Sequence, residues 1–158
     1  MSDDILDINK IVAAVLATIE DPKNLKEAAD VAIDLAQTRT RLGKGVLKAE
    51  AKPTPLKKLT PRTVEIRKGL KKEGKLTGKG ATPKRSGINR TGETLESMYA
   101  KSKRGEVEIQ LDKRGTKVAA ELEKISTNFI FMNLSKSEAK AMVAVLNEKV
   151  RKLGEKLK

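Results

Sequence analysis

A run of Lys and Arg side chains near the middle of the chain is the first sequence feature that points to a chemistry. Residues 73–90 combine four Gly and one Pro with Lys79, Lys84, Arg85 and Arg90. A flexible basic loop of this kind can bind nucleic-acid phosphates or an acidic protein surface, or it can simply be solvated. It does not match the GxxxxGK[ST] phosphate-binding loop, since the GK[ST] ending and a preceding strand are both missing. The four basic side chains are therefore candidate contacts to DNA or to a protein partner.

The positive charge of the chain is concentrated around this loop. The net charge is +13, from 34 Lys and Arg against 21 Asp and Glu. Between Arg41 and Arg90 there are 16 Lys and Arg but only 3 acidic residues, so this third holds the whole excess. No aromatic residue lies there, which argues against stacking on the bases of a single strand. A partner would be recognised by its charge.

Groups suited to catalysis are scarce. The chain has no His and no Cys, which excludes Ser/His/Asp and Cys/His arrangements as well as thiolate metal sites. Glu93 with Glu96, and Glu106 with Glu108, are acidic pairs, but each lies beside Lys or Arg, as on a solvated charged face. We expect a protein that is not an enzyme and that has no catalytic residue, cofactor or metal.

The first residues carry the wrong charge for a signal peptide. Asp3 and Asp4 stand where positive charge is needed, and no apolar run of about 18 residues occurs. We therefore expect a soluble, intracellular protein. With Asp7 these residues could hold a cation, although acidic residues at a helix start are stabilising without one. Tyr99, the only Tyr, is expected in the core with its hydroxyl satisfied.

Helices are expected to build the N-terminal part. Apolar residues at helical spacing predict one helix over residues 4–20 and another over about 22–42, with Asp21 as the N-cap and Pro22 as the first helical residue. Residues 1–43 would form a helical hairpin arm that packs on its own domain or on a neighbouring subunit.

The next segment, residues 44–60, contains Pro53 and Pro55 among lysines and predicts an extended basic linker. Beyond it we expect an α+β domain, residues 61–158, that includes the basic loop. Its helices are predicted over 61–72, 92–98 (capped by Thr91), 116–125 and, after the capping box of Ser135 and Glu138, a long C-terminal stretch.

Strand signals occur only within this domain. Val107, Ile109 and Leu111 alternate with polar residues and predict a hairpin over about 97–111, followed by a turn at 112–115. An apolar run predicts a buried strand over about 128–133. We expect the hairpin and this strand to form one small antiparallel sheet packed with helices.

The order of these signals over residues 59–153 resembles the tail-completion, or virion-morphogenesis, proteins of tailed phages. That family has a helix opened by Leu-Ser/Thr, a TG-x-L-x-x-S segment, a hairpin, and an aromatic strand with Leu-Ser before a final helix. The matching residues here are Leu59, Thr60, Thr63, Thr91, Gly92, Leu95, Ser97, Phe131, Leu134 and Ser135. The segment KVAAELEK departs from the family pattern, since it lacks a Tyr and a closing Gly.

The resemblance implies a structural virion protein. Such proteins form a homo-oligomeric ring at the neck, where they join the head connector or portal adaptor to the tail after assembly in the host cytoplasm. The basic loop would then face packaged DNA without sequence preference, or an acidic connector, and no membrane would be involved. The alternative is a stand-alone nucleic-acid-binding protein that uses residues 41–90 as a phosphate-binding arm.

Overall fold

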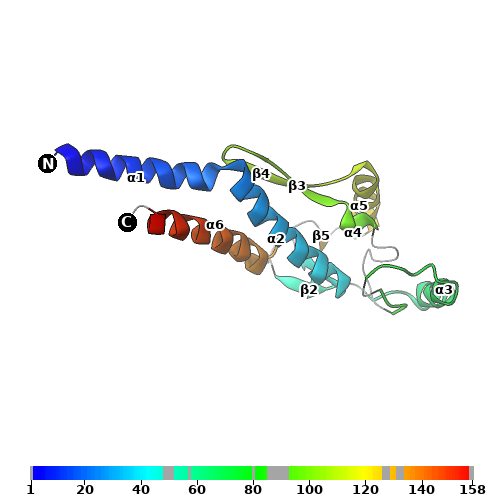
Figure 1. Cartoon of the computed structure of the whole chain (residues 1–158). Helices are drawn as coiled ribbons and strands as arrows, with labels where there is room; N and C mark the ends of the chain where they lie inside the picture. The colour runs from blue at the N-terminus through cyan, green and yellow to red at the C-terminus, as the bar shows by residue number, and fades with distance from the viewer. Residues whose placement is uncertain are drawn as a thin grey trace.

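The structure is a computed structural model that describes residues 2–47, 52–56, 58–79, 81–84, 93–125, 129–130 and 134–156. Its helices are α1 (Ser2–Glu20), α2 (Pro22–Arg41), α3 (Pro61–Lys72), α4 (Glu93–Glu96), α5 (Lys113–Ile125) and α6 (Lys136–Lys156). Its strands are β1 (Lys44–Leu47), β2 (Pro53–Pro55), β3 (Met98–Lys103), β4 (Glu106–Leu111) and β5 (Phe129–Ile130). The predicted α+β class is confirmed (Figure 1).

Helix α2 is the central element of the described fold. It contacts α6 and the β3–β4 hairpin, and its C-terminal end leads into β1 (Figure 1). Small side chains on its inner faces let these neighbours approach closely. The buried apolar residues of α2 are Leu25, Ala28, Ala29, Ala32, Ile33 and Ala36. The second helix of the predicted arm thus packs within its own chain.

The junction between α1 and α2 follows the predicted capping chemistry. The Asp21 carboxylate accepts hydrogen bonds from the backbone N–H groups of Lys23 and Asn24, at 2.8 and 3.1 Å, and Pro22 opens α2. These bonds satisfy two of the donors that a helix start leaves free. Gly43, with φ of 75°, follows the end of α2, where a left-handed conformation is needed.

The predicted hairpin is confirmed as β3 and β4. Met98 and Ala100 of β3 are buried against α2 together with Leu95 of α4, and Gly105 takes a φ of 72° at the turn. Tyr99, expected in the core, is 45% exposed, because it alternates with two buried neighbours and so faces outward. Its hydroxyl is nevertheless 2.9 Å from the Gln110 side-chain oxygen.

The expectation of one sheet is wrong. Strand β5 pairs with β1 rather than with the hairpin, and β1 also pairs with β2. Two parts of the predicted linker are therefore strands, and Val46 of β1 is almost fully buried between them. These strands are too short for an alternating pattern, so their pairing comes from contacts between distant segments. The predicted strand extends beyond β5 to residues 128 and 131–133, which lie outside the described residues.

Helix α5 begins earlier than predicted. The expected turn at residues 112–115 is wrong, because the Asp112 carboxylate accepts a hydrogen bond from the Gly115 backbone N–H at 2.6 Å and the helix starts at Lys113. Asp112 thus acts as the helix cap. Helix α4 is shorter than the predicted 92–98, and Thr91, its predicted cap, lies outside the described residues.

A methyl group at Gly115 has no space in this arrangement. Its Cβ would collide with the Ser97 hydroxyl and lie 3.1 Å from Leu111 Cβ. We expect Gly115→Ala to lower the free energy of unfolding by about 1–3 kcal/mol, despite the helix propensity of Ala. Urea denaturation measures the change. Adding Ser97→Ala should recover part of the loss, and Gly154→Ala, where the Cβ meets nothing within 4 Å, is the control. An unchanged midpoint for Gly115→Ala would contradict the clash.

Candidate functional site

Helix α3 and its flanking segments form the basic lobe, defined here as residues 58–84. Figure 1 shows α3 at the end of the molecule opposite the N-terminus and apart from both sheets. No residue of α3 is buried, so packing contributes little to its stability.

The ends of α3 instead carry strong local signals. The Thr60 hydroxyl accepts a hydrogen bond from the Thr63 backbone N–H, and Pro61 opens the helix. At the other end Gly74, with φ of 70°, allows the Lys75 backbone N–H to bond the Leu70 carbonyl. That is a Schellman closure. Sequence-local capping therefore holds this helix, as the Thr60–Pro61 signature predicts.

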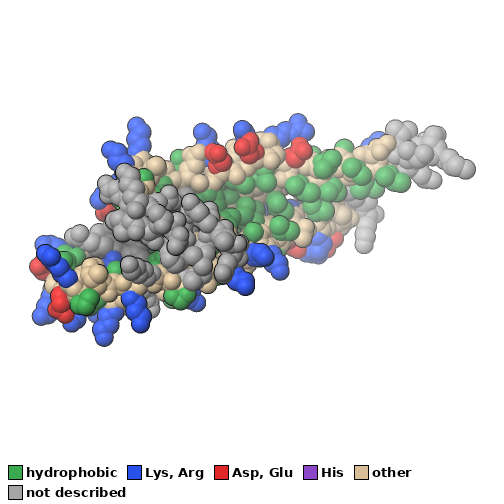
Figure 2. All heavy atoms as spheres, turned by 180° about the vertical axis from the view of Figure 1, so that it is seen from behind, with side chains coloured by type: hydrophobic (Ala, Val, Ile, Leu, Met, Phe, Trp, Pro, Cys, Tyr) green, Lys and Arg blue, Asp and Glu red, His purple; other side chains and the backbone are tan. Residues whose placement is uncertain are grey.

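The basic lobe has a large excess of positive charge. Two carboxylates, Glu65 and Glu73, stand against nine basic residues of the segment. The basic residues are Lys58, Arg62, Arg67, Lys68, Lys71, Lys72, Lys75, Lys79 and Lys84. Glu65 pairs with Lys68 at 2.6 Å and Glu73 with Lys75 at 2.8 Å, on the surface. Figure 2 shows Lys and Arg side chains gathered at this end of the molecule.

The sequence-predicted contacts fall partly within this lobe. Lys79 and Lys84 are exposed residues of the segments that follow α3. Arg85 and Arg90 lie outside the described residues. The contact residues named from the sequence all lie in the loop, although the alternative function used residues 41–90 as a whole. The exposed basic side chains of α3 belong to the same lobe. The density of Lys and Arg over residues 62–72 was the available signal.

The second candidate surface is an apolar stripe on α1. Its large apolar side chains are exposed at helical spacing, from Ile8, 59% exposed, through Leu16, 51% exposed, to Ile19. The full stripe is Ile8, Ile11, Val12, Leu16 and Ile19. Residues at this spacing share one face of a helix. Figure 2 shows the band of hydrophobic side chains that runs along this part of the molecule.

A second apolar stripe lies on the outer side of α2. Val31 and Leu35 of α2 and Leu42, the residue that caps its C-terminal end, are exposed and stand four and seven residues apart, which puts them on one side. The inner faces of α2 bind α6 and the hairpin, so this stripe is separate from the core. The sequence predicted apolar periodicity in both helices but not which side would be left uncovered.

A buried ion pair joins α2 to the start of α6. The Arg39 guanidinium lies 2.8 Å from a Glu138 carboxylate oxygen, and both side chains are 5% exposed. The other oxygen of Glu138 accepts the Ser135 backbone N–H at 2.6 Å, and the Ser135 hydroxyl accepts the Glu138 N–H at 3.3 Å, which confirms the predicted capping box. Burial lowers the pKa of Arg39, and the charge of Glu138 opposes that shift. This pair joins α2 to the start of α6 within the buried part of the fold.

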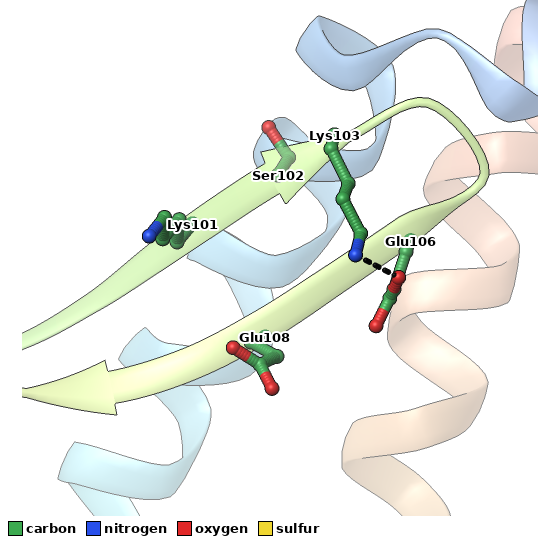
Figure 3. Close-up of a pocket in the computed structure, with 5 residues that line it drawn as sticks. All are labelled: Lys101, Ser102, Lys103, Glu106 and Glu108. Carbon is green, nitrogen blue, oxygen red and sulfur yellow. Dashed lines mark ion pairs between the residues drawn. The ribbon is translucent and has the colours of Figure 1, made fainter.

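The acidic pairs considered as catalytic groups are matched by basic residues. Figure 3 shows the hairpin surface where Lys103 and Glu106 point toward each other, at 2.7 Å. This contact raises the pKa of Lys103. Glu93 pairs with Arg114 at 2.9 Å. Alternating charges across an exposed strand pair are typical of a solvated face.

Comparisons of the chain with protein-family models, with curated proteins and with solved structures find no match. Within the described residues, no group of His, Cys, Asp and Glu has the arrangement to hold a metal ion. In the same part of the chain, no helix is long and apolar enough to cross a membrane. The candidate functional surfaces are the basic lobe and the apolar stripes of α1 and α2.

Proposed function

We propose that this protein is a structural subunit of a tailed-phage virion that forms an oligomeric ring at the head–tail junction and joins the connector to the tail. The observation that carries the proposal is the uncovered apolar stripe of α1. A single chain gains little by exposing five large apolar side chains along one helix face, whereas a subunit interface would remove them from water. The sequence resemblance supplies the biological setting.

The two stripes differ in position and in length. The stripe of α1 and that of α2, which includes Val31 and Leu35, belong to different helices of the same chain. Contact between two unlike patches is heterologous, and it closes into a ring when the rotation between copies allows it. A contact of α1 on the α2 stripe of the next subunit therefore accounts for both exposed surfaces at once.

The test is self-association of the α1 stripe variant. We expect Val12→Glu with Leu16→Glu to weaken association by about a hundredfold or more, since burying two carboxylates against an apolar surface without partners is costly. Sedimentation and light scattering over a range of concentrations measure this. Ala17→Glu adds charge at an exposed position on the opposite face and should leave association unchanged. A wild-type protein that stays monomeric, alone and with its connector, would contradict the proposal.

The alternative function is a stand-alone nucleic-acid-binding protein, and the basic lobe is the observation that favours it. Under this alternative the purified chain is a monomer that binds duplex DNA with a steep salt dependence. Under the leading proposal the lobe instead lies at the junction, toward DNA or an acidic connector. The association experiment separates the two, because the alternative needs no ring.

A further inference from the structure

We propose that α3 is a docking element for the phosphate backbone of double-stranded nucleic acid, with Lys68, Lys71 and Lys72 as its main contacts, and that binding raises the helical order of α3. The inference deepens the proposed function by naming the partner of the basic lobe. It rests on that function for its setting, although its test does not depend on self-association.

The charge pattern of α3 places like charges close together along the helix. Lys68 and Lys72 stand four residues apart with the same charge, and Lys71 is three residues from Lys68. Like charges at this spacing destabilise a helix by about 0.2–0.5 kcal/mol per pair. The helix dipole, which favours Lys71 and Lys72 in the last turn, and the pair of Lys68 with Glu65 offset this cost. Glu65 is the only acidic residue within the helix. A bound polyanion would remove this repulsion.

The stability of α3 is also small for other reasons. The helix has 12 residues, none of them buried. An isolated helix of about 12–15 residues is marginal in water, so the end caps are its main support. Any ligand that binds the helical form better than the unfolded form shifts this local equilibrium toward the helix.

The surface of α3 fits a phosphate backbone better than a protein partner. Protein interfaces have an apolar core with aromatic anchors. Ile66 is the only exposed large apolar residue of α3, and residues 41–90 contain no aromatic side chain. A duplex presents about ten phosphate charges over the ~18 Å that a helix of this length spans. Charge alone then supplies the affinity, and no bases are read.

The exposed basic side chains can reach such a partner without disturbing the fold. Lys68, Lys71 and Lys72 are all exposed, they are three and four residues apart and so share one face of the helix, and α3 lies apart from both sheets (Figure 1). Replacing them with Gln keeps the length and polarity of the side chains while removing charge. We therefore expect the variant to unfold at the same temperature as the wild type.

The experiment measures binding of the full chain to a fluorescein-labelled DNA duplex of about 24 base pairs by anisotropy over a range of salt concentrations. We expect the variant Lys68→Gln/Lys71→Gln/Lys72→Gln to bind at least about tenfold more weakly, with a salt slope smaller by about 2.7, from about 0.9 for each phosphate contact removed. The matched control removes the same charge from α6, as Lys136→Gln/Lys140→Gln/Lys156→Gln, and should retain binding.

Three results would overturn the inference. One is unchanged duplex binding by the α3 variant. If that variant keeps duplex binding but loses binding to poly-L-glutamate, the partner of α3 would be an acidic protein. Another is an equal loss of duplex binding in the α6 control, which would indicate that binding depends on the total charge of the chain and not on α3. The third concerns order: amide exchange in residues 61–72 should slow when the duplex is added, and an unchanged exchange rate at saturation would exclude the coupling.

Failure of the inference about α3 can be distinguished from failure of the assembly proposal. The α3 variant should self-associate like the wild type, because its substitutions lie far from the α1 stripe (Figure 1). Conversely, Val12→Glu with Leu16→Glu should keep duplex binding per subunit. Loss of both properties in either variant would count against the inference, since one surface would then serve both.

Discussion

Replacing Arg39 with Met should lower the free energy of unfolding by about 3–5 kcal/mol, because the Glu138 carboxylate would remain buried without its partner. Both side chains are 5% exposed, and the two charged groups are 2.8 Å apart. The loss is a large fraction of the stability of a domain of this size, which is about 5–15 kcal/mol. Urea denaturation followed by circular dichroism measures it, with an unchanged m-value as the sign of two-state behaviour.

Two further variants test the cause of this loss. Arg39→Met with Glu138→Gln removes the uncompensated charge but keeps the capping acceptor, so it should recover more than half of the stability. Lys26→Met breaks the exposed pair with Asp30 on the same helix, at 3.0 Å. An exposed pair at this spacing contributes about 0.3–0.5 kcal/mol, so this control should change little. If the double variant is as unstable as Arg39→Met alone, the buried charge is not the reason.

Shortening Leu95 to Ala should cost about 2–5 kcal/mol of unfolding free energy. Leu95 is fully buried at 0% exposure, between α2 and the hairpin, and its carbonyl accepts a hydrogen bond from Gln37 of α2 at 2.8 Å. Closely packed neighbours on rigid elements relax only partly around a truncated side chain, so a cavity remains. Chemical denaturation gives the change in midpoint.

The control for Leu95 is another apolar residue of the same chain. Ile66 of α3 is 56% exposed, and Ile66→Ala should change the free energy of unfolding by no more than about 0.5 kcal/mol. A loss for Leu95→Ala as small as the one for Ile66→Ala would mean that α4 does not anchor the core. In that case α4 would be a peripheral turn rather than the link between α2 and the hairpin.

Most features with sequence-local causes were predicted correctly, with the Asp112 cap of α5 as the exception. Asp21 with Pro22, Thr60 with Pro61, and Ser135 with Glu138 each mark a helix start through hydrogen bonds to residues two or three positions away. The hairpin likewise follows from alternation and a turn glycine. Its register pairs Ala100 with Ile109, close in sequence. Short-range chemistry of this kind is readable without knowing what packs against it.

The candidate site was predicted only in part. The charge excess of residues 41–90 was visible, but its concentration around α3 depends on that helix lying apart from the sheets (Figure 1). Periodicity gave apolar faces to α1 and α2 without saying which residues stay exposed. Leu16 and Ala29 both belong to apolar helix patterns, yet one is exposed and the other buried. The exposure of a side chain depends on which other side chains pack against it, and the tertiary structure decides that.

By itself, then, the sequence determined the starts of α2, α3 and α6, the hairpin and the location of the positive charge, because these depend on residues a few positions apart. The tertiary structure alone decided the pairing of β5 with β1, the contact of Arg39 with Glu138, and the outward position of Tyr99. Each of these features depends on how distant parts of the chain pack. The first two depend on which segment contacts β1 or α2, and the third depends on which face of the hairpin packs against α2. Local preference is too weak to specify such contacts, since the burial of the whole chain decides among them.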